Sequence, residues 1–198
     1  MARQGMLLII SGPSGVGKTT IARDGENPRG ARFSVSMTTR PRAAKDVEGV
    51  DYYFVDRAAF EGAIERDELL EWAQVFENYY GTPRRPVEAA LAAGELIILE
   101  IDVQGARQVK QRMRDAYAMF IKPPSEAELL RRLRARARED EAVIQKRFAN
   151  AKREIALAES SDVYDLFIVN EQLDRAIDEA VTKVNEERAR RCGSRLSK

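Results

Sequence analysis

One short stretch near the N-terminus constrains this chain more than any other. Residues 12–19 read Gly-Pro-Ser-Gly-Val-Gly-Lys-Thr, which fits the pattern G-x-x-x-x-G-K-[ST], and they follow an apolar run over residues 6–11. Glycines let backbone N–H groups close around phosphate oxygens because no Cβ atoms intervene, and the N-terminus of the following helix adds positive potential. We therefore expect a buried strand, a phosphate-binding loop and a helix, in that order.

The loop assigns roles to its own residues. The Lys18 ammonium is expected to reach the β- and γ-phosphates of a nucleoside triphosphate, and the Thr19 hydroxyl is expected to hold Mg²⁺. The predicted ATP contacts of this segment are Gly12, Pro13, Ser14, Gly15, Val16, Gly17, Lys18, Thr19 and Thr20. The alternative is a glycine-rich turn that binds nothing.

The composition removes several classes of chemistry. Histidine is absent, which excludes Ser-His and Cys-His nucleophilic schemes and imidazole zinc sites. Lys+Arg number 33 and Asp+Glu 32, so the net charge of +1 gives no global argument for a nucleic-acid or membrane partner. The apolar runs are too short to span a bilayer, no signal peptide is visible, and the lone Cys192 has no intrachain disulfide partner. A cytoplasmic protein is expected.

Strands alternate with helices over most of the chain. The helix after the loop is expected to be short, because glycine, asparagine and proline fall close together within residues 25–30. The apolar patterns predict further strands at 33–36, 96–102, 117–121 and 166–169, and helices near 87–93, around 109–113, from 126, over 141–159 and around 176–184. This order predicts a parallel sheet with helices on both faces, a three-layer α/β/α fold.

Residues 51–82 differ from this pattern. Strands are expected at 52–55 and 69–75, with a helix capped by Asp56 between them, and most aromatic residues fall here. We expect one domain in which the core comprises residues 1–34, 85–125 and 151–198. A small strand-rich insertion would then span 35–84, and an arginine-rich helical segment 126–150.

Several polar residues suggest a second substrate site. Arg40 and the Tyr52 hydroxyl suit the grip of a phosphate, although a solvated loop explains them as well. Glu71 lies between Leu70 and Trp72, so strand alternation alone places it on the solvent face. A carboxylate buried there would instead need hydrogen-bonding partners to stay ionised. Glu100 and Asp102 end a buried strand beside the loop, where carboxylates commonly hold Mg²⁺.

Blocks of this sequence resemble the guanylate kinases, in the family's order and nearly its spacing. The blocks are SVSMTTRPR at 34–42, GVDY at 49–52, LEWA at 70–73, NYYGT at 78–82, LEIDVQG at 99–105, PPS at 123–125 and VN at 169–170. The resemblance covers residue 6 to about 176. It implies a P-loop fold in which the insertion over 35–84 binds GMP and the segment over 126–150 is a lid. The implied reaction is Mg²⁺-dependent transfer of the ATP γ-phosphate to GMP or dGMP.

The resemblance also implies roles for individual residues. Asp102 joins Thr19 near the metal, Arg136 and Asn170 contact ATP, and Lys18, Arg40, Arg132 and Arg147 carry the charge of the transition state. The implied GMP contacts are Ser36, Arg40, Arg42, Tyr52, Glu71, Tyr80, Thr82 and Glu100.

The sequence departs from the family pattern at the GMP loop. Ala43 stands where the family has a second phosphate-binding arginine, and Lys45 and Asp46 stand where it has glycine and glutamate. Arg42 lies one residue before Ala43 and could take the place of the missing arginine if the loop shifts. Two alternatives therefore stay open, namely a guanylate kinase-like module that binds proteins with little or no catalysis, and a kinase for another nucleoside monophosphate. A homo-oligomer is compatible with the sequence.

Overall fold

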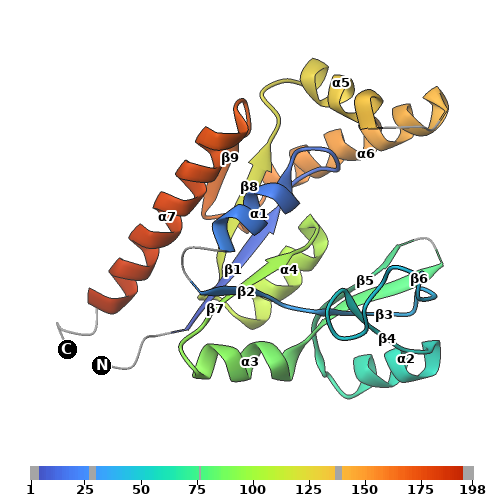
Figure 1. Ribbon diagram of the computed structural model, residues 1–198, viewed down its shortest axis with the longest axis vertical. Coiled ribbons are helices and arrows are strands. Elements are labelled where there is room, and N and C mark those ends of the chain that lie inside the picture. Colours follow the sequence, from blue (N-terminus) through green and yellow to red (C-terminus); the bar gives the residue numbers. More distant parts are fainter. Residues whose placement is uncertain (1–4, 27–29, 76, 137–139, 194–198) are drawn as a thin grey trace.

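A parallel sheet between two layers of helices forms the centre of the computed structural model, which describes residues 5–26, 30–75, 77–136 and 140–193 (Figure 1). The sheet has the strand order β2-β7-β1-β8-β9, and all neighbouring pairs are parallel. Its strands are β1 (Met6–Ser11), β2 (Ala31–Phe33), β7 (Leu96–Glu100), β8 (Tyr117–Lys122) and β9 (Leu166–Val169). The predicted three-layer fold is confirmed.

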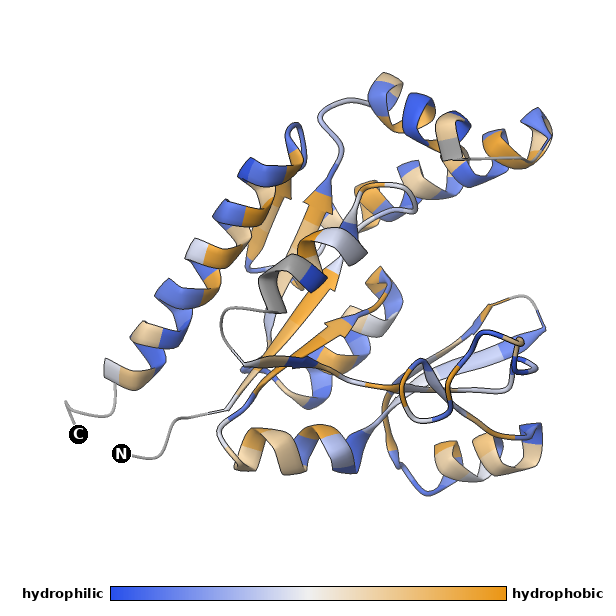
Figure 2. Ribbon diagram, in the orientation of Figure 1, coloured by the Kyte–Doolittle hydropathy of each residue, from blue (hydrophilic) through white to orange (hydrophobic). Residues whose placement is uncertain are grey.

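Each face of this sheet has its own apolar core. Helices α1 (Lys18–Glu26) and α7 (Leu173–Gly193) cover one face, where Ile21 and Ala180 pack against Ile10. The other face is covered by α3 (Arg84–Ala92), α4 (Val103–Arg112) and the C-terminal part of α6 (Glu141–Glu159). The apolar strands lie between helices that turn their hydrophilic sides outward (Figure 2). Burial on both faces is why these strands read as continuous apolar runs.

A second, smaller sheet projects from the core with the order β4-β3-β6-β5 (Figure 1). Its strands are β3 (Ser36–Thr38), β4 (Tyr52–Phe54), β5 (Leu69–Val75) and β6 (Asn78–Pro83). Helix α2 (Arg57–Glu65) begins at the predicted cap, because Asp56 Oδ1 accepts a hydrogen bond from Ala59 N at 2.7 Å. Phe60 and Leu69 form a separate apolar cluster with Met37, Trp72 and Tyr79. The insertion therefore has a core of its own.

The structure corrects the prediction of one strand over 33–36. Phe33 ends β2 in the main sheet and pairs with Ile98, whereas Ser36 begins β3 in the small sheet and pairs with Tyr52. The four residues thus cross from one sheet to the other. Strand β6 was not predicted, because its polar and glycine-containing sequence has little apolar alternation.

A helical pair stands above the sheet at the end where the phosphate loop lies (Figure 1). Helix α5 (Glu126–Arg136) packs on the N-terminal part of α6 through Leu129, Leu133, Ile144 and Ala151. This pair corresponds to the arginine-rich segment expected over 126–150. Within the described ranges, no helix is both long and apolar enough to cross a membrane.

Candidate active site

The loop between β1 and α1 has the conformation that its glycines permit. Gly12, Gly15 and Gly17 have φ values of 151°, 86° and 97°, which side chains with a Cβ rarely adopt. A Cβ on Gly12 would also lie 2.4 Å from the carbonyl oxygen of Ile121. The buried Val16 anchors the loop in the core beneath α1. The segment is therefore a backbone cradle fixed by the sheet, as predicted.

Lys18 lies folded over this cradle. Its Nζ donates hydrogen bonds to Gly12 O at 2.6 Å and to Pro13 O at 3.2 Å. Burial lowers the pKa of Lys18, while the nearby carboxylates of Glu100, Glu154 and Asp102 act in the opposite direction. The ammonium is thus held beside the loop backbone.

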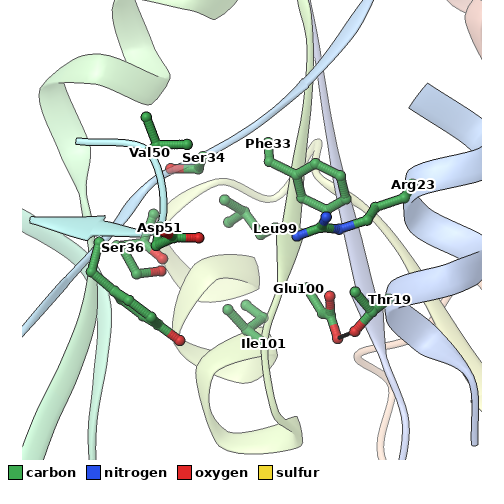
Figure 3. A pocket seen from close by; sticks show the side chains of 12 residues that line it. Thr19, Arg23, Phe33, Ser34, Ser36, Val50, Asp51, Leu99, Glu100 and Ile101 are labelled. Atoms are coloured by element: carbon green, nitrogen blue, oxygen red, sulfur yellow. Dashed lines mark hydrogen bonds between the residues drawn. The ribbon is translucent and has the colours of Figure 1, made fainter. Parts of the chain in front are cut away.

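A cavity of about 380 Å³ connects the loop helix to the small sheet (Figure 3). Thr19 Oγ1 donates a 2.7 Å hydrogen bond to Glu100 Oε1 at one wall. Four residues predicted to bind GMP, Ser36, Tyr52, Thr82 and Glu100, line the cavity. Segments far apart in the sequence thus meet around one space next to the phosphate loop.

The other lining residues were not predicted as site residues, and they are Arg23, Phe33, Ser34, Val50, Asp51, Leu99 and Ile101. Arg23 lies four residues after Thr19 in α1, and this spacing, which places both on one helix face, was a usable signal. Its guanidinium points into the cavity beside Phe33 (Figure 3). Phe33 and Ser34 had no comparable signal, because their place depends on where the chain crosses between the two sheets.

Glu71 is buried, with 6% of its surface exposed, so the solvent-facing interpretation from strand alternation is wrong. A bulge between Leu69 and Glu71 adds one residue to β5, and this breaks the regular alternation of the strand. The Thr82 hydroxyl donates a 2.6 Å hydrogen bond to Glu71 Oε1. A Cβ on Gly105 would lie 2.8 Å from Glu71 Oε2, so only glycine leaves room for this carboxylate.

Burial also changes the charge state of Glu71. Desolvation raises its pKa to about 7, although the hydrogen bonds from Thr82 favour the ionised form. Asp102 adds a smaller contribution in the same direction as burial, because two negative charges repel. The result is an acceptor that titrates close to neutral pH in a site that water reaches poorly.

Aromatic rings surround the predicted phosphate-binding arginine. The Arg40 guanidinium carbon lies 5.4 Å from the Tyr52 ring centroid and 5.5 Å from that of Phe54. Tyr52 and Tyr80 make an edge-to-face contact with centroids 6.0 Å apart. Burial raises the pKa of Tyr52, so its hydroxyl stays a hydrogen-bond donor at neutral pH. The structure thus brings Arg40, Tyr52 and Tyr80 together.

The loop with the unusual sequence folds around Asp46. Asp46 Oδ2 accepts hydrogen bonds from Arg40 Nη2 at 2.8 Å and from the Ala43 backbone N–H at 2.7 Å. Arg42 Nε donates to the backbone carbonyl of Asp46 at 2.9 Å. Arg42 is therefore bound to its own loop here, and Ala43 contributes only a backbone N–H.

The acidic residues beside the loop are placed differently from one another. Strand β7 ends at Glu100, and Asp102 caps α4 by accepting a 2.7 Å hydrogen bond from Gly105 N. Hydroxyl and carboxylate oxygens at Thr19 and Glu100 form a donor set that Mg²⁺ prefers. Within the described ranges, no three acidic side chains cluster closely enough to hold a metal alone. An ion here would therefore take further ligands from phosphate and water.

The helical pair formed by α5 and α6 contacts the loop. Arg147 Nη2 of α6 donates to Ser14 Oγ at 2.8 Å. Arg132 Nη2 of α5 donates to the Asn170 carbonyl at 3.0 Å, and its Nε donates to Glu128 Oε1 at 2.7 Å. The Arg136 side chain, also predicted to bind ATP, lies outside the described residues.

A second cavity, of about 280 Å³, adjoins the outer side of the loop. It is lined by Gly15, Gly17, Thr20, Arg132 and Asn170 among others. Asn170 is 4% exposed and its Nδ2 donates to Val16 O at 2.8 Å. Among the described residues, its buried Oδ1 accepts no hydrogen bond. Asn170 Oδ1 is thus a buried acceptor without a hydrogen bond from the described part of the chain, on a residue that lines this cavity.

Comparisons with known proteins agree on one family. The family model described as guanylate kinase matches residues 4–187. Proteins named guanylate kinase from Mesorhizobium japonicum and Agrobacterium fabrum are 49% and 46% identical to this chain, each covering 96% of it and 86% of the relative. A crystal structure of guanylate kinase from Anaplasma phagocytophilum superposes with a TM-score of 0.73 at 36% identity, covering 95% of this chain and 89% of that one.

Proposed function

This chain belongs to the guanylate kinase family of nucleoside monophosphate kinases, and from that premise we propose that it transfers the γ-phosphate of ATP to GMP or dGMP, giving ADP and GDP. One observation carries the choice of substrates. The cavity beside the phosphate loop is lined by Thr19 and Glu100 on one side and by Ser36, Tyr52 and Thr82 on the other. A nucleoside monophosphate bound there would lie directly next to a triphosphate held by the loop.

The base is proposed to be guanine. The Thr82 side chain lines the cavity, and its hydroxyl donates a 2.6 Å hydrogen bond to the buried Glu71 carboxylate. Guanine offers paired N1–H and N2–H₂ donors to such an acceptor, whereas adenine has no such pair. Ser36 adds a hydroxyl on the neighbouring strand β3. The phosphate would then lie towards Arg40, Tyr52 and Tyr80, where a guanidinium and two phenols converge.

The reaction needs no protein nucleophile, because an oxygen of the GMP phosphate attacks the γ-phosphorus directly. Lys18 neutralises charge on the transferred group, and Arg40 holds the attacking phosphate in position. Thr19 and Glu100 would hold Mg²⁺, with Asp102 nearby at the start of α4. When bound, this ion shields the charges of the phosphate oxygens.

Residues 126–150 are proposed to act as the lid. Arg147, which contacts Ser14 at 2.8 Å, and Arg132 would bring positive charge to the phosphates and exclude water. Arg136 is proposed to join them. The cavity beside Asn170 is proposed to take the adenine ring, whose amino group would donate to the free Oδ1 atom.

A substrate panel tests the proposal. ADP release is measured with ATP, Mg²⁺ and each of GMP, dGMP, AMP, CMP, UMP and dTMP. Rapid turnover of GMP and dGMP alone is expected. Turnover of none of the six would refute the kinase and favour a protein-binding module, and equal turnover of AMP would refute guanine selectivity.

A further inference from the structure

The strand that carries Glu71 is an edge strand, and an amide side chain completes its edge. Within the described chain, β5 has β6 as its only strand neighbour. The Trp72 N–H donates to Gln108 Oε1 at 3.2 Å, and Gln108 Nε2 donates to the Trp72 carbonyl at 2.9 Å. A primary amide has one donor group and one acceptor in the arrangement of a peptide backbone. Gln108 therefore takes the place of a neighbouring strand at this one residue.

The helix that carries Gln108 also contacts Glu71 itself. Gly105, three residues earlier in α4, leaves the space that Glu71 Oε2 occupies, because a Cβ there would lie 2.8 Å from that oxygen. Asp102, three residues earlier again, caps the helix. Residues at this spacing lie along one side of a helix. One side of α4 thus follows β5 from the carboxylate to the backbone of the next residue.

We propose that Gln108 is a positioning residue for guanine recognition, which holds the backbone of Trp72 so that the adjacent Glu71 carboxylate faces the base. This inference rests on the proposed function, since it takes guanine to be the base that Glu71 binds. A one-residue shift of a strand turns its side chains to the opposite face, and the bulge before Glu71 leaves the register irregular at this point. The two hydrogen bonds between Gln108 and the Trp72 backbone hold β5 in one register directly after Glu71.

Inosine monophosphate provides the discriminating probe. It keeps the N1–H of GMP and lacks the 2-amino group, so it forms one fewer hydrogen bond with the Glu71 carboxylate. If Glu71 is displaced, the binding of GMP weakens more than the binding of IMP, and the preference for GMP falls. A general loosening of the small sheet would weaken the binding of both nucleotides to a similar degree and leave the preference for GMP unchanged.

The test compares Gln108→Ala with the wild-type chain. We expect the KM for GMP to rise about tenfold and the ratio of kcat/KM for GMP over IMP to fall about fivefold, with the KM for ATP within about twofold. Gln108→Glu keeps the acceptor for the Trp72 N–H and loses the donor, so an intermediate ratio is expected. Gln104→Ala and Gln111→Ala are matched controls, because both glutamines lie exposed on the same helix, and neither should change the ratio.

An unchanged GMP preference in Gln108→Ala would overturn the inference, as would an equal fall in both controls. If that variant does not fold by circular dichroism, Gln108→Glu and Gln108→Met carry the same comparison. Calorimetric binding of GMP and IMP gives the ratio without turnover. Lack of GMP turnover by the wild-type chain therefore refutes the proposed function, while the binding ratio still decides the role of Gln108. A wild-type chain that binds IMP as well as GMP would refute the inference as well.

Discussion

The two halves of the proposed active site, one for the triphosphate and one for GMP, differ in how far apart in the sequence their residues lie. The triphosphate half is built mostly by consecutive residues, 12–20, whose glycines determine the backbone path. The GMP half gathers residues from β3, β4, β5 and β6 and from the loop over 40–46. Local conformational preference suffices for the first half. The second half depends on the packing of a small sheet against α4, so a change outside the cavity can disturb it.

The cations of the two halves also have different partners. Lys18 donates to neutral carbonyl oxygens of its own loop, whereas Arg40 donates to the Asp46 carboxylate at 2.8 Å. A phosphate arriving at Lys18 replaces carbonyl groups. One arriving at Arg40 competes with the Asp46 carboxylate, whose negative charge attracts the guanidinium more strongly than a neutral carbonyl group attracts the Lys18 ammonium. The GMP half is therefore expected to limit substrate affinity.

The largest expected effect is in the triphosphate half. Lys18→Ala should lower kcat by about 10³-fold or more for every nucleoside monophosphate, because a preorganised charge at the transferred phosphate is lost. Single-turnover and steady-state assays measure this effect. Lys183→Ala, which changes a half-exposed lysine on α7, is the matched control and should leave kcat unchanged. Comparable activity in the two variants would contradict the assignment of Lys18.

Glu71→Gln should impair the use of GMP and leave the binding of ATP nearly unchanged. The variant keeps the shape of the side chain and loses the charge that accepts two guanine donors, so kcat/KM for GMP should fall about 10- to 100-fold. The KM for ATP should change less than about twofold, since the loop is untouched. Steady-state kinetics with each substrate varied in turn separate the two constants. A similar rise in the KM for GMP and the KM for ATP would mean that the two halves are not independent.

Ala43→Arg should strengthen the GMP half. It restores a second guanidinium beside Arg40, and one charge-assisted contact lowers the KM for GMP by about tenfold. The same kinetic series with GMP measures the change. Arg42→Ala supplies the complementary test, because a large loss there combined with no gain from Ala43→Arg would show that Arg42 already serves the phosphate.

The last prediction concerns the pH dependence of folding stability. Burial raises the pKa of Glu71 to about 7, so between the ordinary value of 4.5 and 7 the folded state binds a proton that the unfolded state has released. The contribution of Glu71 to folding stability is therefore lost as pH rises through this window. Glu71→Gln should accordingly be more stable than the wild-type chain at pH 8 by up to about 3 kcal/mol, with the difference disappearing near pH 4.5.

Urea denaturation at the two pH values measures this difference. A constant gap between the variants, independent of pH, would place the pKa of Glu71 near its ordinary value. In the same range, GMP binding should weaken as pH falls below 7, because the protonated carboxyl no longer accepts from guanine.

The sequence predicted the triphosphate half of the proposed site better than the GMP half. The loop, Lys18 and the parallel strands were found from motif and apolar pattern alone. The burial of Glu71 was obscured, because the bulge at Leu70 breaks the alternation on which the prediction depended. The Arg40–Asp46 pair had no local signal, since it depends on how the loop closes. Gln108 carried no signal either, because its partner lies 36 residues away on another element.

The bulge in β5 has a consequence for how the protein unfolds. Leu69 packs in the core of the insertion, and Leu70 packs in the core of the main sheet beside Leu99 and Val103. Two neighbouring residues thus belong to two hydrophobic cores. The insertion cannot open at β5 without withdrawing Leu70 from the main core, so amide protons of this strand should exchange only with the most global openings. Among the described residues, strands β3 and β4 contribute none to the main core on that face, so we expect their amide protons to exchange faster than those of β5.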